Sequence, residues 1–222
     1  MRGKTIVITG GFGALGRAVA DEARARGANV AQLDIKTPDG AADPLAFAVD
    51  LTNLAETSRV MNDIRAKAGS IDALLNIAGG YVWEPLDEGA IDAWERMFAL
   101  NVKTALTSTK AALPHLKEAK GAIVNVGAFG AVKADGGNGP YAASKQGVMK
   151  LTESLAAELK GQVRVNAVLP SIIDTAANRK DMPKADPAKW VQPVELARVM
   201  LFLASDDASA ITGALVPVMG RV

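Results

Sequence analysis

The stretch Thr5-Ile6-Val7-Ile8-Thr9-Gly10-Gly11-Phe12-Gly13-Ala14-Leu15-Gly16 decides the fold. A short apolar run, typical of a buried parallel strand, leads into a glycine-rich turn and then into a helix-period segment. Gly11, Gly13 and Gly16 form the pattern G-x-G-x-x-G, whose small residues let a backbone approach a pyrophosphate at a helix N-terminus. The stretch predicts a dinucleotide-binding turn, with a structural turn without ligand as the alternative. A P-loop is excluded because Arg17 and Ala18 follow Gly16, where Lys and Ser or Thr would be needed.

Strand-like and helix-like segments alternate along the rest of the chain. The predicted strands are residues 5–9, 29–34, 46–50, 73–77, 122–126, 163–169 and 214–218, and the predicted helices are residues 15–26, 54–68, 92–117, 141–160 and 194–204. This order predicts one Rossmann-type α/β domain over residues 1–222, with a doubly wound parallel sheet of about seven strands and helices on both faces. The irregular stretch 170–190 is long for a compact domain, so we expect it to be a substrate loop.

Composition excludes several classes of function. Lys and Arg total 25 against 24 for Asp and Glu, and this balance argues against a nucleic-acid or anionic-membrane partner. The chain has no cysteine and one histidine, so thiolate chemistry and a typical zinc site are not expected, and we predict no metal. There is no apolar run of 18 residues, and the N-terminal apolar run ends in glycines without a cleavage pattern. We therefore expect no membrane span and a cytoplasmic protein.

Asp34, at the end of the second predicted strand, bears on the choice of cofactor. It lies 18 residues after Gly16, near the spacing at which an acidic residue accepts hydrogen bonds from an adenine-ribose 2′-hydroxyl. The same carboxylate would repel a 2′-phosphate, which favours NAD over NADP. Arg17 and Lys36 lie close in sequence and would partly neutralise it, so NADP stays open.

Tyr141 and Lys145 have the spacing Tyr-x-x-x-Lys at the start of a predicted helix, which puts both side chains on one helical face. Together with the glycine turn, this pattern resembles the short-chain dehydrogenase/reductase family over essentially the whole chain. Further matches follow in the family's order: Asp50-Leu51, Asn76-Ile77-Ala78-Gly79, Asn101, Asn166-Ala167-Val168-Leu169-Pro170 and Ile211-Thr212-Gly213.

The resemblance implies the roles of the site residues. Tyr141 would exchange the proton, Lys145 would bind the nicotinamide ribose and lower the pKa of the tyrosine, and Asn101 would anchor a water in the proton relay. The cofactor-binding residues would be Gly10, Gly11, Phe12, Gly13, Leu15, Gly16, Asp34, Asp50, Leu51, Asn76, Ala78, Gly79, Tyr141, Lys145, Pro170, Ile173 and Thr175. The partner would be a small-molecule substrate, and the long helices would form a homodimer or homotetramer.

The sequence departs from the family's pattern at two positions. Ala14 replaces the middle glycine of the turn found in short members, and Ala128 stands where the family places its catalytic serine. The quinonoid dihydropteridine reductase branch also lacks that serine. Its loop is similar to the run from Asp174 to Asp186 with Trp190 after it, and an aromatic follows A-G-G there as Tyr81 does here.

Three hypotheses stay open at this point. The first is an NADH-dependent reductase of a conjugated, quinonoid dihydropterin-like ring, with Tyr81 or Trp190 beside it; among the tryptophans, Trp190 is expected in the pocket. The second is a general carbonyl or alcohol dehydrogenase in which a water or a backbone N–H replaces the serine. The third is a dinucleotide-binding sensor that has lost its chemistry.

Overall fold

The protein is built around one parallel β-sheet. The computed structural model describes residues 1–38, 40 and 43–222. In this part of the chain seven strands pair in the order β3-β2-β1-β4-β5-β6-β7. They are β1 (Thr5–Thr9), β2 (Asn29–Asp34), β3 (Ala46–Ala48), β4 (Ala73–Asn76), β5 (Ala122–Val126), β6 (Arg164–Pro170) and β7 (Leu215–Val218). The predicted seven-stranded parallel sheet is confirmed.

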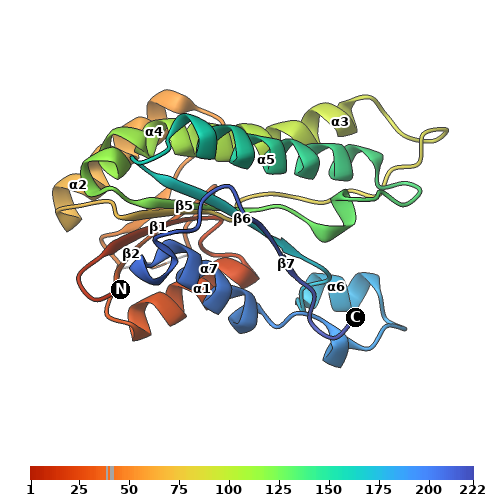
Figure 1. Ribbon diagram of the computed structural model, residues 1–222. Coiled ribbons are helices and arrows are strands. Elements are labelled where there is room, and N and C mark those ends of the chain that lie inside the picture. The colour runs from red at the N-terminus through yellow and green to blue at the C-terminus, as the bar shows by residue number, and fades with distance from the viewer. Residues whose placement is uncertain (39, 41–42) are drawn as a thin grey trace.

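Helices cover both faces of the sheet, as predicted (Figure 1). One layer holds α2 (Leu54–Ala68), α3 (Asp92–Met97), α4 (Thr104–Ala119) and α5 (Gly139–Glu158), and the other holds α1 (Ala14–Ala25) and α7 (Pro193–Ala204). Because side chains alternate along a strand, Ile6 and Ile8 of β1 pack in the α1–α7 core while Val7 packs in the core under α2 and α4. The middle of β1, residues 6–8, is apolar because both of its faces are covered.

Most predicted strands and helices have ends within two residues of those in the structure, and two predicted segments differ more. The predicted helix 92–117 consists of α3, a π-helical turn η1 (Phe98–Lys103) and α4. The stretch 170–190, predicted as irregular, contains α6 (Ala176–Asp181) and a 3₁₀ turn η3 (Pro187–Lys189), and an isolated parallel bridge joins Ile173 to Val191. Short 3₁₀ turns η2 (Phe129–Ala131) and η4 (Asp206–Ala208) complete the elements.

The strand order reverses between β1 and β4. The chain runs from β1 outward to β2 and β3 on one side, and then returns to β4 on the other side of β1. In open α/β sheets, the loops that leave the carboxyl ends of two such strands diverge to opposite faces and leave a crevice between them. The glycine turn after β1 and the loop after β4 border this crevice, which is where the candidate site lies.

Candidate active site

The glycine turn between β1 and α1 is closed by backbone contacts that exclude larger side chains. Gly10 has φ +63°, and a Cβ on it would approach the backbone of Ala78 to 2.9 Å. A Cβ on Gly16 would collide with the carbonyl oxygen of Gly10. Helix α1 then begins at Ala14; Gly13 before it has no side chain to cap the helix, and the first turn has no acidic residue. Free N–H groups at a helix N-terminus bind anions, so the turn fits a pyrophosphate.

Asp34 faces this turn from the end of β2. Its carboxylate accepts hydrogen bonds from the backbone N–H of Phe12 (3.2 Å) and of Ile35 (2.8 Å). Arg17 donates from Nε to the carbonyl oxygen of Phe12 at 2.7 Å. The structure therefore brings Asp34 and Arg17, two of the three residues that bear on cofactor choice, to the same turn, with the carboxylate held by the backbone.

The predicted cofactor-binding residues Asp50, Leu51 and Ala78 lie beside the ends of β3 and β4. Asp50 accepts hydrogen bonds at 2.8 Å from the backbone N–H and the hydroxyl of Thr52, and these bonds lower the pKa of the Asp50 carboxyl. Leu51 is buried in the sheet core. The backbone N–H groups of Ile77 and Ala78 both donate to the Thr9 hydroxyl, at 3.0 and 3.1 Å, which ties the loop after β4 to the end of β1.

Asn76 is placed differently from its predicted role. Its side chain lies in a buried network, where Nδ2 donates to Asn125 Oδ1 (2.8 Å) and Thr109 Oγ1 (3.2 Å), and Asn125 donates to Thr152. This network joins β4 and β5 to α4 and α5. The structure thus gives the Asn76 side chain a place between sheet and helices, and it is not among the described residues that line the cavity.

A cavity of about 1080 Å³ opens at the carboxyl ends of the central strands. Six of the predicted site residues line it: Leu15, Gly79, Tyr141, Lys145, Pro170 and Ile173. Ala128 also lines it, on the segment after β5. The volume is that of a small-molecule site, and most of the exposed lining is apolar.

Tyr141 and Lys145 lie on the first turns of α5 and both face this cavity. Lys145 is buried, and its Nζ donates to the carbonyl oxygen of Val126 at 2.8 Å. Burial lowers the pKa of Lys145 to about 8. Burial, and secondarily the neighbouring Tyr81, raises the pKa of Tyr141 to about 12. Burial therefore keeps the Tyr141 phenol protonated at neutral pH, and the expected lowering of its pKa by Lys145 stays a prediction.

Aromatic side chains form one wall of the cavity. The rings of Tyr81 and Tyr141 meet edge to face, with centroids 4.9 Å apart and an interplanar angle of 76°. The hydroxyl of Tyr81 donates to Asn138 Oδ1 at 2.9 Å. Trp83 and Phe129 line the same cavity. Tyr81 also lines the cavity, and its place beside a substrate ring stays a prediction.

The expectation for Trp190 is wrong. Its side chain is 2% exposed and belongs to the buried core, while Trp83 lines the cavity. The carbonyl oxygen of Ile172 accepts a hydrogen bond from Val191, and the carbonyl of Pro187 accepts one from Trp190, so the end of the 170–190 stretch folds back on its start. The stretch still contributes to the cavity through Ser171, Ile172, Asn178, Asp181 and Met182. Thr175 caps α6 through a hydrogen bond from Asn178 N.

Asn101 lies in the π-helical turn behind the cavity wall. Its Oδ1 accepts from Gly80 N (2.9 Å), and its Nδ2 donates to Gly80 O (3.1 Å) and to Ser144 Oγ (2.9 Å). A Cβ on Gly79 would collide with Asn101 Oδ1. Sequence reasoning did not find Gly80, Asn138 or the contact to Ser144, because these hydrogen bonds join elements 21 to 57 residues apart.

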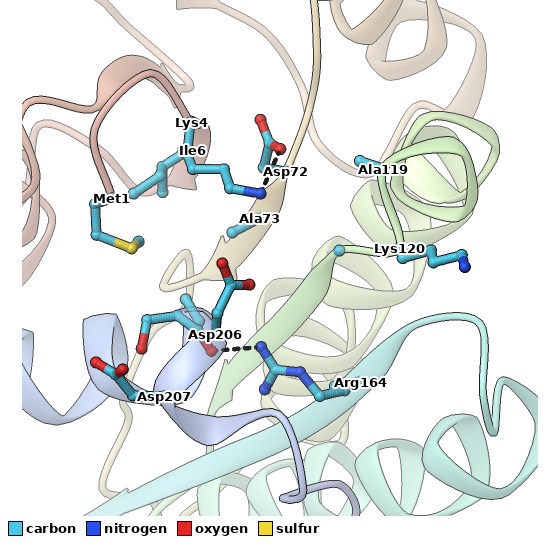
Figure 2. A pocket seen from close by; sticks show the side chains of 13 residues that line it. Met1, Lys4, Ile6, Asp72, Ala73, Ala119, Lys120, Arg164, Asp206 and Asp207 are labelled. Atoms are coloured by element: carbon cyan, nitrogen blue, oxygen red, sulfur yellow. Dashed lines mark hydrogen bonds and ion pairs between the residues drawn. The ribbon is translucent and has the colours of Figure 1, made fainter.

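A second, smaller cavity lies at the opposite edge of the sheet, near the start of β1 and β4 (Figure 2). Its volume is about 170 Å³, and an ion pair of 3.4 Å between Lys4 and Asp72 crosses it. The Arg164 guanidinium there donates to the carbonyl oxygens of Leu203, Ser205 and Ala208. These donors hold the end of α7 against β6, which is a structural use, and we place no chemistry in this cavity.

The comparisons with known proteins agree with this geometry. The family model described as short chain dehydrogenase matches residues 4–186. The chain belongs to this family. A meso-2,3-butanediol dehydrogenase of Serratia marcescens is 35% identical over 236 residues, which cover 98% of this short-chain dehydrogenase and 93% of the relative. A 3-oxoacyl-[acyl-carrier-protein] reductase of Thermotoga maritima is 31% identical, and the alignment covers 99% of this chain and 98% of the relative.

Solved structures give the same assignment. An aldohexose dehydrogenase of Thermoplasma acidophilum superposes with a TM-score of 0.91 at 29% identity, over 99% of this short-chain dehydrogenase and 94% of that chain. A carveol dehydrogenase of Mycobacterium avium in complex with NAD shares the fold, with a TM-score of 0.88 at 24% identity over 99% and 97%. The protein is an NAD(P)-dependent oxidoreductase. This assignment favours the two enzyme hypotheses over the hypothesis of a non-catalytic sensor.

No helix in the described ranges is long and apolar enough to cross a membrane. Among the same residues, no group of three or more His, Cys, Asp or Glu side chains is placed to hold a metal ion.

Proposed function

We propose that this short-chain dehydrogenase is an NADH-dependent reductase of a small conjugated ring, a quinonoid dihydropterin or a close analogue. The observation that carries the proposal is Ala128, a methyl side chain lining the cavity that also holds Tyr141 and Lys145. A ketone that accepts hydride gathers negative charge on one oxygen, and each donor aimed at such an oxygen contributes on the order of 3 kcal/mol. A quinonoid ring spreads that charge over several heteroatoms, so that one proton donor suffices.

The aromatic wall supports the same substrate class. Tyr81, Trp83 and Phe129 border the cavity beside Tyr141. Flat conjugated rings stack against or meet the edges of such side chains with favourable geometry. A planar bicyclic ring is therefore a better fit to this wall than an open-chain alcohol.

Tyr141 acts as the proton donor. Its pKa of about 12 keeps the phenol protonated at neutral pH, as a donor must be. Lys145 carries three N–H donors, of which one is used by the Val126 carbonyl. The others are available to anchor the hydroxyls of a nicotinamide ribose and to stabilise the phenolate left after proton transfer.

The residues of the first turn fit the cofactor. A Cβ on Gly16 would collide with the backbone of the turn itself, and α1 begins without a side-chain cap, which suits a pyrophosphate. The Asp34 carboxylate lies against the turn at Phe12 N, and a carboxylate there would accept hydrogen bonds from an adenine-ribose hydroxyl and repel a 2′-phosphate, which supports NADH over NADPH. Bound NADH supplies the hydride. The residues of the chain bind the NADH, orient the substrate ring and deliver the proton.

A second candidate is a general carbonyl or diol dehydrogenase. The 35% identity to a meso-2,3-butanediol dehydrogenase favours it. In that case a water or a backbone N–H near Ala128 takes the place of the serine hydroxyl. The two candidates share the cofactor and Tyr141, and they differ in the substrate that the cavity accepts.

Ala128→Ser separates the two candidates. NADH oxidation is followed with quinonoid dihydropterin and with a panel of ketones and diketones, for the unchanged protein and the variant. We expect the unchanged protein to prefer the pterin, and the serine to raise ketone reduction without raising pterin reduction. Ala131→Ser, a buried alanine on the same 3₁₀ turn, is the matched control. Efficient ketone reduction by the unchanged protein, with no activity on the pterin, would contradict the proposal.

We also propose a homodimer or homotetramer, in the cytoplasm, assembled through the long helices. The apolar side chains of Trp94, Phe98, Leu100 and Leu106 are between 38% and 57% exposed along α3, η1 and α4. Exposed apolar side chains gathered on one helical segment are typical of subunit contacts. A cysteine-free chain is consistent with a reducing compartment.

A further inference from the structure

Ser144 stands at a junction behind the active-site wall. It is 3% exposed, lies on α5 between Tyr141 and Lys145, and is not among the described residues that line the cavity. Its hydroxyl donates to the carbonyl oxygen of Tyr141 at 2.7 Å and accepts from Asn101 Nδ2 at 2.9 Å. One side chain therefore joins the helical turn that carries the proton donor to the π-helical turn.

The direction of each hydrogen bond is fixed by donor counts. A serine hydroxyl has one hydrogen, and here it goes to the Tyr141 carbonyl, so Ser144 can only accept from Asn101. Asn101 must then turn its NH₂ group toward Ser144 and its oxygen toward Gly80 N. The second N–H of that amide reaches Gly80 O at 3.1 Å. The orientation of the buried amide follows from the network, with no acceptable flipped alternative.

The network reaches the substrate side through Gly80. Tyr81 follows Gly80, and its ring meets the Tyr141 ring at 4.9 Å. Ser144 thus connects to Tyr141 by two routes, directly through the carbonyl and indirectly through Asn101, Gly80 and Tyr81. Both routes fix the position of the Tyr141 ring relative to the cavity wall.

We propose that Ser144 is a positioning residue for proton transfer, acting through the Asn101 amide and the first turn of α5. This inference rests on the proposed role of Tyr141 as proton donor. Removing the hydroxyl leaves a buried amide N–H without its acceptor and frees the Asn101 side chain to shift. Misplacing a reacting group by a fraction of an ångström slows the chemical step strongly, and substrate binding less.

The test compares Ser144→Ala with Ser144→Thr, which keeps the hydroxyl, and with Ser154→Ala. Ser154 is an exposed serine on the same helix that donates to Glu158, and it serves as the control. We expect Ser144→Ala to lower kcat about tenfold, with KM for the substrate and Kd for NADH changed less than twofold. Ser144→Thr should recover most of kcat. Equal effects on kcat and Kd, or no effect on kcat, would overturn the proposal.

A double-mutant cycle with Asn101→Ala tests the route, with melting temperatures recorded for every variant. If Ser144 acts through Asn101, the double variant is about as slow as the slower single variant. Multiplied effects of the two substitutions would overturn this route. Tyr141→Phe separates the two proposals: full activity in that variant removes the proposed function, whereas an inactive Tyr141→Phe with a fully active Ser144→Ala removes only the positioning role.

Discussion

We propose that two residues of α5, Tyr141 and Lys145, carry the chemistry, and burial shifts the pKa of each side chain. Burial disfavours the charged form of each side chain. It therefore lowers the pKa of Lys145 to about 8, because the ammonium is the charged form, and raises the pKa of Tyr141 to about 12, because the phenolate is the charged form. The sequence predicts both residues from their spacing. It does not predict these directions, since they depend on what surrounds the side chains after folding.

Tyr141→Phe should reduce turnover by at least about 100-fold, the lower range for loss of a general acid. The Kd for NADH should change little, since the phenol is not expected to carry much of the cofactor affinity. Lys145→Ala should weaken NADH binding and slow turnover together, because the ammonium is proposed both to anchor the nicotinamide ribose and to stabilise the phenolate of Tyr141. Steady-state kinetics and fluorescence titration of NADH measure the two effects. Near-normal turnover in Tyr141→Phe on every substrate found would refute the donor role.

The buried ammonium of Lys145 also makes stability depend on pH. Between about pH 8 and 10.5 the unfolded chain keeps this proton while the folded protein has lost it, so the free energy of unfolding rises with pH in this window. The rise amounts to at most about 3 kcal/mol. The free energy of unfolding is measured with urea for the unchanged protein and for Lys145→Met, at intervals from pH 7 to 10. The contributions of the other titrating groups cancel in the difference between the two proteins. As the pH rises, the free energy of unfolding of the unchanged protein should increase relative to that of Lys145→Met. A difference that does not change with pH would contradict the prediction.

At the scale of elements, the sequence predicts the bounds of some strands and helices and misses others. Strands β1, β2 and β5 and helix α2 have the bounds that the sequence predicts, because each is an apolar or amphipathic run with clear ends. The π-helical turn at Phe98–Lys103 has no signature in periodicity; it exists beside the hydrogen bonds of Asn101 to Gly80. Likewise, Trp190 is in the core because the chain folds back through the Ile173–Val191 bridge.

The junction of β2 with the glycine turn should select the cofactor. NADH should bind at least tenfold more tightly than NADPH, a difference of about 1.4 kcal/mol. The reason is the Asp34 carboxylate, held by Phe12 N where a 2′-phosphate would bring a second negative charge. Asp34→Asn should narrow the ratio, and Asp21→Asn, an exposed aspartate on α1, should not. Equal affinities of the unchanged protein would direct attention to Arg17, which donates to the same turn.

At the scale of the whole molecule, the fold and the position of the site were predictable from the order of the segments. Seven parallel strands with a reversal between β1 and β4 put Leu15 at the start of α1, Gly79 and the start of α5 around one cavity. Substrate class depends on side chains that meet from distant segments, such as Trp83, Phe129 and Asn138, and spacing carries no signal for those meetings.

The exposed apolar side chains of α3, η1 and α4 should hold copies of the protein together. Light scattering after size exclusion should give the mass of a dimer or a tetramer. Replacing Phe98 and Leu106 with Glu should lower that mass, because two charges would enter an apolar contact. Leu54→Glu, at the exposed start of α2, is the control. A monomeric unchanged protein would contradict the assembly.

The setting of Lys145 has a consequence for covalent labelling. An amine with a pKa of about 8 is unprotonated in roughly one molecule in ten at pH 7, whereas a lysine at the reference value is so in fewer than one in a thousand. The unprotonated amine is the nucleophile, and Lys145 borders a cavity wide enough for a small reagent. A small, uncharged acylating reagent at low concentration should therefore modify Lys145 early among the amines of the chain. Because the ribose would occupy the same place, NADH should protect it, and mass spectrometry of digested protein would map the cofactor site without any substrate.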